Sequence, residues 1–369
     1  MTGLAAALVL AACGGSGIGG GGTSTVTVAK AVGKPSGDLE ISNWALYIDK
    51  KTIPEFEQSS GISVNYIEDI NSYDDFFGKM QPLLAKGQSG GRSLMVATDW
   101  LAKKMYDLGY IQKLDKKALA PALSHLNPDL KAPDSDPDHT FSIPWQGGMT
   151  GLIVNTAEAS GITSVNDIFD PKYKGKVEMV SELREVVPLV MKGEGTDPAT
   201  ATPQDWLDTI DKIKAATESG QIRRITGGDY AKDLASGDVV AVVGWAADAI
   251  QLQADNPELR WVMPDQGCML WYDNWVIPVG APNPTAAYDW INYTYEPRHQ
   301  AQIDAYVNAV TPVAGVKQIF EKTDPALARN QLIFPSKRYT SRCSSVPSLP
   351  GTADEQRQIE QAWAQATQA

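Results

Sequence analysis

Hydrophobic and polar positions follow two alternating patterns along the chain. Short apolar runs, some with every second position polar, predict β-strands, and segments with apolar residues three or four apart predict helices. In the first third of the chain, strands are expected at 39–43, 62–67 and 94–98, and helices at 50–59, 73–86 and 100–108. Strands that alternate with helices in this way form βαβ units with a mostly parallel sheet.

The same alternation restarts after residue 140. Strands are expected at 141–144, 151–155, 177–180, 239–243 and 275–278, and the first two flank a pair of glycines. Helices are expected from Pro203, from about Asp248, over 286–295 and from about Asp354. The start at Pro203 is well marked, because Thr202 is a typical N-cap and proline suits the first helical position. No repeat or second linker interrupts the chain, so we expect two α/β lobes without a loose hinge segment.

The N-terminal residues have the features of a lipoprotein signal. A short apolar run from Leu4 ends in Leu10-Ala11-Ala12-Cys13, which matches the bacterial lipobox, and the run is too short to span a bilayer. Residues 14–25 are nearly all Gly, Ser and Thr and should form a flexible tether. We therefore predict a signal over 1–13 with lipidation at Cys13, a tether over 14–37 and folding from about Asp38. The alternative is an Ala-rich start that arose by chance.

Composition narrows the possible partners. The chain has 369 residues, enough for two domains, and a formal net charge of -12. This acidity argues against nucleic acid and anionic membrane surfaces, which need a basic face, and it would attract a cation. Many exported proteins are acidic for solubility alone, so charge does not decide the ligand. Cys268 and Cys343 lie far apart without zinc-site spacing, and whether they pair is left open.

Motifs typical of enzymes occur only in the wrong context. Gly17-x-Gly19-x-x-Gly22 matches a dinucleotide fingerprint, but no strand precedes it and no helix follows. Gly87-x-Ser89-x-Gly91 matches a nucleophile elbow, but a helix precedes it and a strand follows, which is the reverse of the required order. The three histidines, His125, His139 and His299, have ordinary loop or helix-end surroundings. We predict no catalytic residue, no metal site and no cofactor.

Aromatic residues and carboxylates recur together at the ends of predicted strands. These segments are 44–47, 98–100, 182–185, 245–248 and 271–273. The carboxyl ends of strands in an open α/β sheet are where ligands bind. Carboxylates can hold ammonium groups by charge-assisted hydrogen bonds, while indole and phenol rings cover methylenes and attract cations. The pattern therefore favours a small organic cation such as a polyamine.

Several of these residues also have a purely structural interpretation. Glu182 and Glu185 can stabilise the positive end of a helix dipole. Trp245 and Trp271 can be core residues, and we favour Asp99 as the N-cap of the helix that begins at Trp100.

In order and spacing, these motifs resemble the spermidine/putrescine-binding proteins of bacterial ABC transporters over about 39–312. Asn43-Trp44-x-x-Tyr47 resembles that family's first ligand motif, and Glu182-Leu183-Arg184-Glu185 its acidic-x-Arg-acidic motif. Trp271-x-Asp273 resembles the Trp-x-Asp motif, whose acid grips an ammonium group. The resemblance implies the following ligand-binding residues: Trp44, Tyr47, Thr98, Trp100, Glu182, Glu185, Trp245, Trp271 and Asp273.

The resemblance also implies the architecture and the cellular role. It implies an α/β class II periplasmic-binding-protein fold, with one lobe formed by 38–147 and 274–312 and the other by 148–273 and 313–369. The protein would be a monomeric, lipid-anchored receptor on the extracytoplasmic face of the membrane. It would deliver polyamines to the permease subunits of an ABC importer and would not be an enzyme.

The sequence departs from the family pattern at three places. Ala309 stands where the family usually has a cleft tyrosine, and Tyr306 lies nearby at a different spacing. Ser93 stands where an acid is common, and 335–350 do not align. These departures leave ligand length and affinity open. The alternatives are a receptor of the same fold for thiamine, a phosphonate or ferric iron, a secreted enzyme, or an envelope interaction protein.

Overall fold

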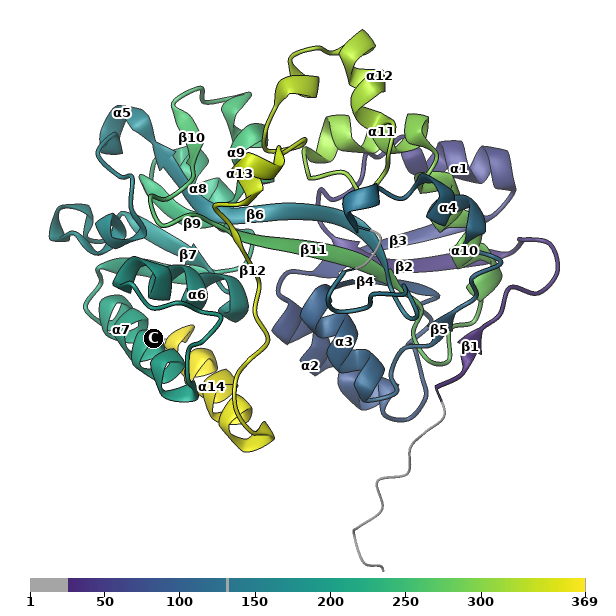
Figure 1. Cartoon of the computed structure of the whole chain (residues 1–369), viewed down its shortest axis with the longest axis horizontal. Coiled ribbons are helices and arrows are strands. Elements are labelled where there is room, and N and C mark those ends of the chain that lie inside the picture. The colour runs from purple at the N-terminus through teal and green to yellow at the C-terminus, as the bar shows by residue number, and fades with distance from the viewer. Residues whose placement is uncertain (1–25, 131–132, 369) are drawn as a thin grey trace, which may run out of the picture.

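The computed structural model describes residues 26–130 and 133–368, so Cys13, the lipobox and the Gly-rich tract over 14–25 lie outside the described residues. A ten-stranded sheet, flanked by helices on both sides, runs through the molecule (Figure 1). Its strand order is β3-β2-β4-β11-β6-β9-β7-β8, with β10 paired to β6 and β12 paired to β11. No helix in the described part of the chain is both long enough and apolar enough to cross a membrane.

The elements of the first third include all those that the hydrophobic pattern predicts, together with three short ones that it did not predict, at 28–29, 113–114 and 120–125. They are β1 (Val28–Ala29), β2 (Asp38–Trp44), α1 (Thr52–Ser60), β3 (Ser63–Ile70), α2 (Tyr73–Leu84), β4 (Leu94–Thr98), α3 (Asp99–Asp107), β5 (Lys113–Leu114) and α4 (Ala120–His125). The pairs β2–β3 and β2–β4 are parallel, as expected for βαβ units. The helix α3 begins directly after the strand, so Thr98 is its N-cap and the N-cap prediction for Asp99 is wrong.

The elements after residue 140 include some that the sequence predicted and some that it did not. They are β6 (Ile143–Asn155), α5 (Thr156–Ala159), β7 (Val177–Val180), α6 (Leu183–Glu194), α7 (Pro203–Glu218), β8 (Ile222–Thr226), α8 (Tyr230–Ser236), β9 (Ala241–Trp245), α9 (Ala246–Gln253), β10 (Leu259–Val262), β11 (Met269–Val276), α10 (Pro284–Thr294), α11 (Pro297–Val307), α12 (Val316–Thr323), α13 (Lys337–Thr340), β12 (Ser344–Ser345) and α14 (Ala353–Ala366). The predicted start of α7 is confirmed by a capping box between Thr202 and Asp205.

Two long antiparallel strands, β6 and β11, connect the halves of the sheet. The sequence predicted two separate strands around Gly147 and Gly148, but β6 runs through both glycines as one strand. An added Cβ on Gly148 would lie 2.2 Å from the Trp271 ring, and one on Gly147 would lie 2.4 Å from the Tyr272 ring. Glycine inside a strand usually weakens it, and here it lets two aromatic rings of β11 lie against β6.

Substituting Gly148 with alanine should therefore destabilise the protein and displace Trp271. We expect a loss of about 1–3 kcal/mol in the free energy of unfolding, as for other overpacked cores. Gly78→Ala in α2 is the matched control, because its Cβ would meet nothing within 4 Å. That change should stabilise the helix by up to about 1 kcal/mol. Denaturant melts of both variants test this, and an unchanged midpoint for Gly148→Ala would contradict the packing.

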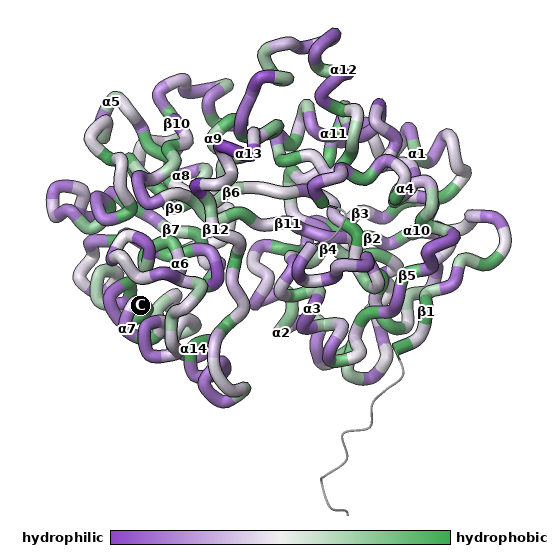
Figure 2. Tube along the Cα trace, viewed as in Figure 1, coloured by the Kyte–Doolittle hydropathy of each residue, from purple (hydrophilic) through white to green (hydrophobic). Residues whose placement is uncertain are grey.

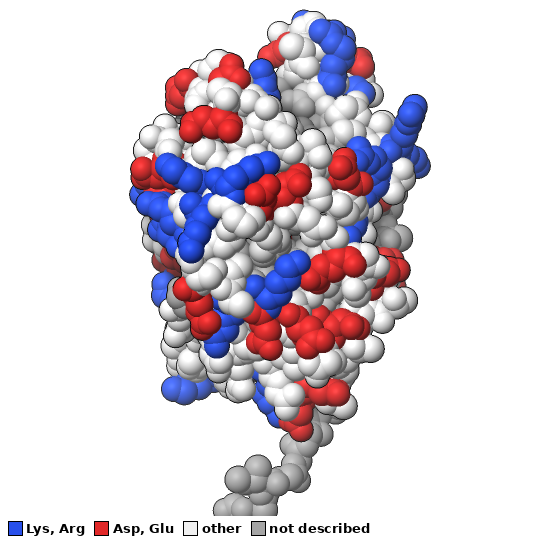
Figure 3. All heavy atoms as spheres, turned by 90° about the vertical axis from the view of Figure 1, so that its left-hand side faces the viewer, with Lys and Arg blue, Asp and Glu red and all other residues white. Residues whose placement is uncertain are grey.

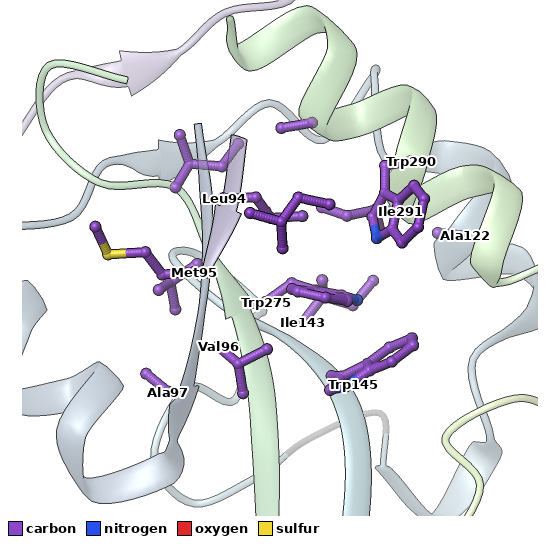
Figure 4. Close-up of a cluster of buried hydrophobic side chains, with 14 of the residues drawn as sticks. Leu94, Met95, Val96, Ala97, Ala122, Ile143, Trp145, Trp275, Trp290 and Ile291 are labelled. Atoms are coloured by element: carbon purple, nitrogen blue, oxygen red, sulfur yellow. The ribbon is translucent and has the colours of Figure 1, made fainter. Parts of the chain in front are cut away.

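Buried apolar side chains form two large cores, one at each end of the sheet. The first gathers residues between 29 and 145 and between 275 and 328, and the second gathers residues between 152 and 269 and between 349 and 366. Figure 4 shows part of the first core, where Trp145, Trp275 and Trp290 pack near Leu94 and Val96. The apolar strands form the interior and the polar segments lie outside (Figure 2). The first core defines the first lobe, and the second core defines the second lobe.

The lobe boundaries stay a prediction. Two segments pack in places other than those that the predicted boundaries assign to them. Residues such as Val316 and Phe320 belong to the first core, although the sequence placed 313–369 in the second lobe. The strand β1 pairs with β5, and the Tyr288 hydroxyl donates a hydrogen bond to the buried Ala29 carbonyl at 2.6 Å. The folded part therefore includes residues before Asp38, where the sequence predicted it to begin. Val28 and Ala29 form a short strand that their Gly-rich surroundings hide in the sequence.

The segment that does not align with the family is fixed to the second lobe. Cys268 and Cys343 form a disulfide, which answers the question that the sequence left open. Next to it, β12 pairs in parallel with β11. The chain then continues to α14, which packs against α7.

Charged side chains on the surface of the second lobe are mostly interspersed (Figure 3). Arg223 and Arg224 of β8 both bind the carboxylate of Glu178, at 2.6 and 2.9 Å, and both bind Asp233. The buried carboxylates between the lobes differ from Glu178 and Asp233, because no pair of arginines among the described residues binds them.

Candidate functional site

A cavity of about 540 Å³ lies between the two lobes, on the face of β11 that carries Trp271 and Asp273. Its lining includes aromatic and acidic residues from both lobes: Trp44, Tyr47, Tyr73, Glu182, Glu185, Trp245, Asp248, Trp271 and Asp273. The lobes touch across it, because the backbone amide of Tyr73 donates to the Glu182 carboxylate at 3.2 Å. The rings of Trp44 and Trp245 also meet edge to face, with centroids 5.4 Å apart. The structure is thus a closed form.

Strand ends bring these residues together. Trp44 ends β2, Trp245 ends β9, and Glu182 follows the end of β7. The turn after β2 holds Leu46 at a φ of 59°, a left-handed conformation that costs a residue other than glycine about 1–2 kcal/mol. This turn places the Tyr47 hydroxyl within hydrogen-bond distance of Asp273. Such strain at the rim of a cleft is typical of functional sites.

Asp273 is a buried carboxylate on the first-lobe side of the cavity. The Tyr47 hydroxyl donates to one carboxylate oxygen at 2.9 Å, and the Tyr73 hydroxyl donates to the other at 2.5 Å. Burial raises the pKa of Asp273 to about 7, and the two tyrosine hydrogen bonds oppose that rise. The group is therefore ready to ionise fully when a cation arrives.

Glu185 lies at the end of a hydrogen-bonded chain on the second lobe. The Trp271 indole donates to the Thr150 hydroxyl at 3.1 Å, and Thr150 in turn donates to the Glu185 carboxylate. The Trp245 indole donates to the same carboxylate oxygen at 2.9 Å. Burial raises the pKa of Glu185 to about 7. Two of the predicted tryptophans thus orient this carboxylate by their N–H groups while both rings line the cavity.

Glu182 holds the N-cap position of α6, as the helix-dipole interpretation would require. Its side chain makes no capping hydrogen bond, however, and reaches across to Tyr73. Burial, followed by the nearby Glu185, raises the pKa of Glu182 well above its ordinary value. The helix terminus favours a negative charge here, but the carboxylate points into the cavity.

Two further residues of the cavity were missing from the predicted set. Tyr73 opens α2, and its sequence position indicated only a helix start after Ser72. Asp248 accepts a hydrogen bond from the Tyr230 hydroxyl, and burial raises the pKa of Asp248 to about 6. Its place three residues after Trp245 was a usable signal, because that segment already paired an aromatic residue with an acid.

Two predicted residues do not line the cavity. The Thr98 hydroxyl is buried and donates to the Tyr272 carbonyl at 3.3 Å. Trp100 lies outside the cavity, where its ring packs against Arg184. Ala309, at the usual tyrosine position, is buried in the first core, and from that segment Val307 lines the cavity instead.

The charges of the cavity are unbalanced. Asp273, Glu182 and Glu185 are buried acids and Asp248 is a partly buried one, while Lys232 is the one basic residue among the described lining residues, with a side chain 86% exposed. Burying carboxylates without a counter-charge is costly, which is why these pKa values rise. No group of three potential metal ligands occurs in the parts of the chain that the structure describes. The cavity is thus built to take a positive charge.

Comparisons with known proteins agree with this geometry. The family model described as "Bacterial extracellular solute-binding protein" matches residues 51–333. The spermidine/putrescine-binding periplasmic protein of Escherichia coli is 25% identical over 299 residues, covering 80% of this chain and 83% of that protein. The putrescine-binding periplasmic protein PotF of Escherichia coli is 27% identical over 311 residues, covering 76% of this chain and 80% of PotF.

A solved structure described as a putative spermidine/putrescine ABC transporter from Listeria monocytogenes superposes with a TM-score of 0.79 at 24% identity. The match covers 89% of this chain and 98% of that chain. The predicted class of periplasmic-binding-protein fold is confirmed by this likeness.

Proposed function

Because the chain belongs to the bacterial extracellular solute-binding proteins, a family of non-enzymatic transport components, we propose that it captures a polyamine in the cavity between its lobes. The main support for a cationic ligand is the group of buried acids among aromatic rings, with no buried base among the described lining residues. The names of two relatives, which include spermidine and putrescine, support the same ligand class.

A flexible diamine matches the arrangement of these groups. One ammonium group would bind Asp273, whose two tyrosine partners leave further lone pairs free. The second would bind the carboxylates at the start of α6, Glu182 and Glu185. The rings of Trp44, Trp245 and Trp271 would cover the methylenes, with cation–π attraction of about 0.5–2 kcal/mol for each close contact.

Membrane attachment and transport complete the proposal. Lipidation at Cys13 would anchor the chain on the extracytoplasmic face, and the closed form would deliver its ligand to the permease subunits of an ABC importer. The support is the lipobox in the sequence and the word "periplasmic" in the names of the relatives. The enzyme alternative gains nothing from Ser89, which is buried and donates its hydroxyl to the Gly280 carbonyl at 3.2 Å.

A panel of ligands in a thermal-shift measurement tests the ligand class. Putrescine, spermidine and spermine should raise the melting temperature, because each would neutralise acids that are costly to bury. Thiamine, an alkyl phosphonate and ferric iron should leave it unchanged. A rise with one of these three and none with any polyamine would refute the proposal and favour another receptor of the same fold.

A further inference from the structure

A second set of contacts joins the lobes outside the ligand cavity. The guanidinium carbon of Arg184, in α6 of the second lobe, lies 3.7 Å from the ring centroid of Trp100, in α3 of the first lobe. Trp100 is the aromatic residue that the sequence placed in the ligand site. Its partner Arg184 lies between Glu182 and Glu185 in the sequence and is only 6% exposed. The ring therefore contacts the other lobe and not the cavity.

Glu360 of α14 connects both lobes at the same place. Its carboxylate accepts from the Arg184 guanidinium at 2.9 Å and from the Lys104 ammonium of α3 at 3.1 Å. A second Arg184 nitrogen lies 3.9 Å from the carboxylate of Asp74 in α2. Burial disfavours the charge on Glu360, but Lys104 and Arg184 hold its pKa below the ordinary value.

The helix that carries Glu360 packs against the second lobe. Ile359 and Trp363 of α14 belong to the second core, and the Trp363 indole donates to the Ser181 carbonyl at 2.8 Å. Lys104 and Trp100 belong to α3, which packs in the first core through Leu101 and Met105. In Figure 1, α6 and α14 of the second lobe face α2 and α3 of the first. Contacts between these pairs must break when the lobes separate.

We propose that Trp100, Lys104, Arg184 and Glu360 form an inter-lobe clasp that populates the closed form before ligand binds and so sets ligand affinity without touching the ligand. These four are positioning residues. A ligand that binds only the closed form gains affinity in proportion to the fraction of protein already closed. The effect on affinity rests on the proposed function, whereas the effect on closure of the free protein does not.

Two clasp variants and one matched control test this inference. Lys104→Met removes the direct ion pair between the lobes, and Glu360→Gln weakens both hydrogen bonds at that carboxylate. Lys103→Met is the control, since it removes the same charge one residue away from the same helix. Its ammonium forms an ion pair with Asp107 within α3 at 2.6 Å, and among the described residues Lys103 has no ion pair with the second lobe.

Small-angle scattering of the ligand-free proteins measures closure, and calorimetry with putrescine measures affinity. Both clasp variants should show a larger radius of gyration than the wild type and about three- to tenfold weaker binding. Lys103→Met should match the wild type in both. Equal radii for the wild type and the two clasp variants would overturn the clasp. If no polyamine binds the wild type, the proposed function fails while the scattering result still decides the clasp.

Discussion

Affinity for a doubly charged amine is expected to fall by about 100-fold or more as the pH drops from 8 to 5.5. In the free protein, burial raises the pKa of both Asp273 and Glu185 to about 7, so both acids are largely protonated at pH 5.5. An ammonium ligand needs their ionised forms, and each unit of pH below the pKa costs about tenfold per group. The amine keeps its charge over this range, because its pKa is near 10 like that of lysine.

Calorimetry at several pH values, in buffers of different ionisation enthalpy, measures both the affinity and the protons released. Proton release should be small at pH 8 and should rise as the pH falls below 7, toward one proton for each of the two acids. The unliganded protein should show the opposite trend in stability. With folded pKa values above the unfolded ones, the native state binds more protons between about pH 4 and 7, so these groups make it less stable as the pH rises. An affinity that does not change between pH 8 and 5.5 would contradict the assignment of these acids to the ligand.

Asp273→Asn should weaken polyamine binding by about 1.5–3 kcal/mol, or roughly 10- to 150-fold, the usual effect of removing a hydrogen bond to a charged group. An amide keeps the shape of the side chain and one oxygen for the tyrosine hydroxyls, but it cannot offset an ammonium charge. Calorimetry with putrescine and spermidine measures the loss.

The matched control for that variant is Asp211→Asn, which removes one negative charge from an exposed position of α7. It should bind like the wild type. The unliganded Asp273→Asn protein should fold at least as stably as the wild type, because it no longer buries an ionisable acid. Wild-type affinity in a folded Asp273→Asn protein would assign that residue to structure alone.

Local periodicity was enough to predict most of the fold. The fully buried run 94–98 and the amphipathic segments around it correspond closely to β4 and its neighbouring helices. What the pattern missed depends on contacts between distant segments. Gly147 and Gly148 interrupt the apolar run of β6, and only the rings of Trp271 and Tyr272, more than 100 residues away, explain their place in a strand.

The candidate site was predicted in large part because strand ends carry it. The structure brings together Trp44, Tyr47, Glu182, Glu185, Trp245, Trp271 and Asp273, and their role in binding stays a prediction. Thr98 and Trp100 lie at a strand-to-helix junction, where a change of one position turns a side chain to another face. Tyr73 was missed because its contact with Asp273 spans 200 residues of sequence.

The acids of the cavity are expected to bind a dication from both lobes. The most direct test is a calorimetric titration of the wild type at pH 8 with putrescine and with mono-acetylated putrescine, which keeps the chain but has one charge. One putrescine should bind per protein, with a dissociation constant of about 10 μM or tighter, and the acetylated form should bind at least about tenfold more weakly. Equal affinity for the two compounds, or no heat from putrescine, would contradict this expectation.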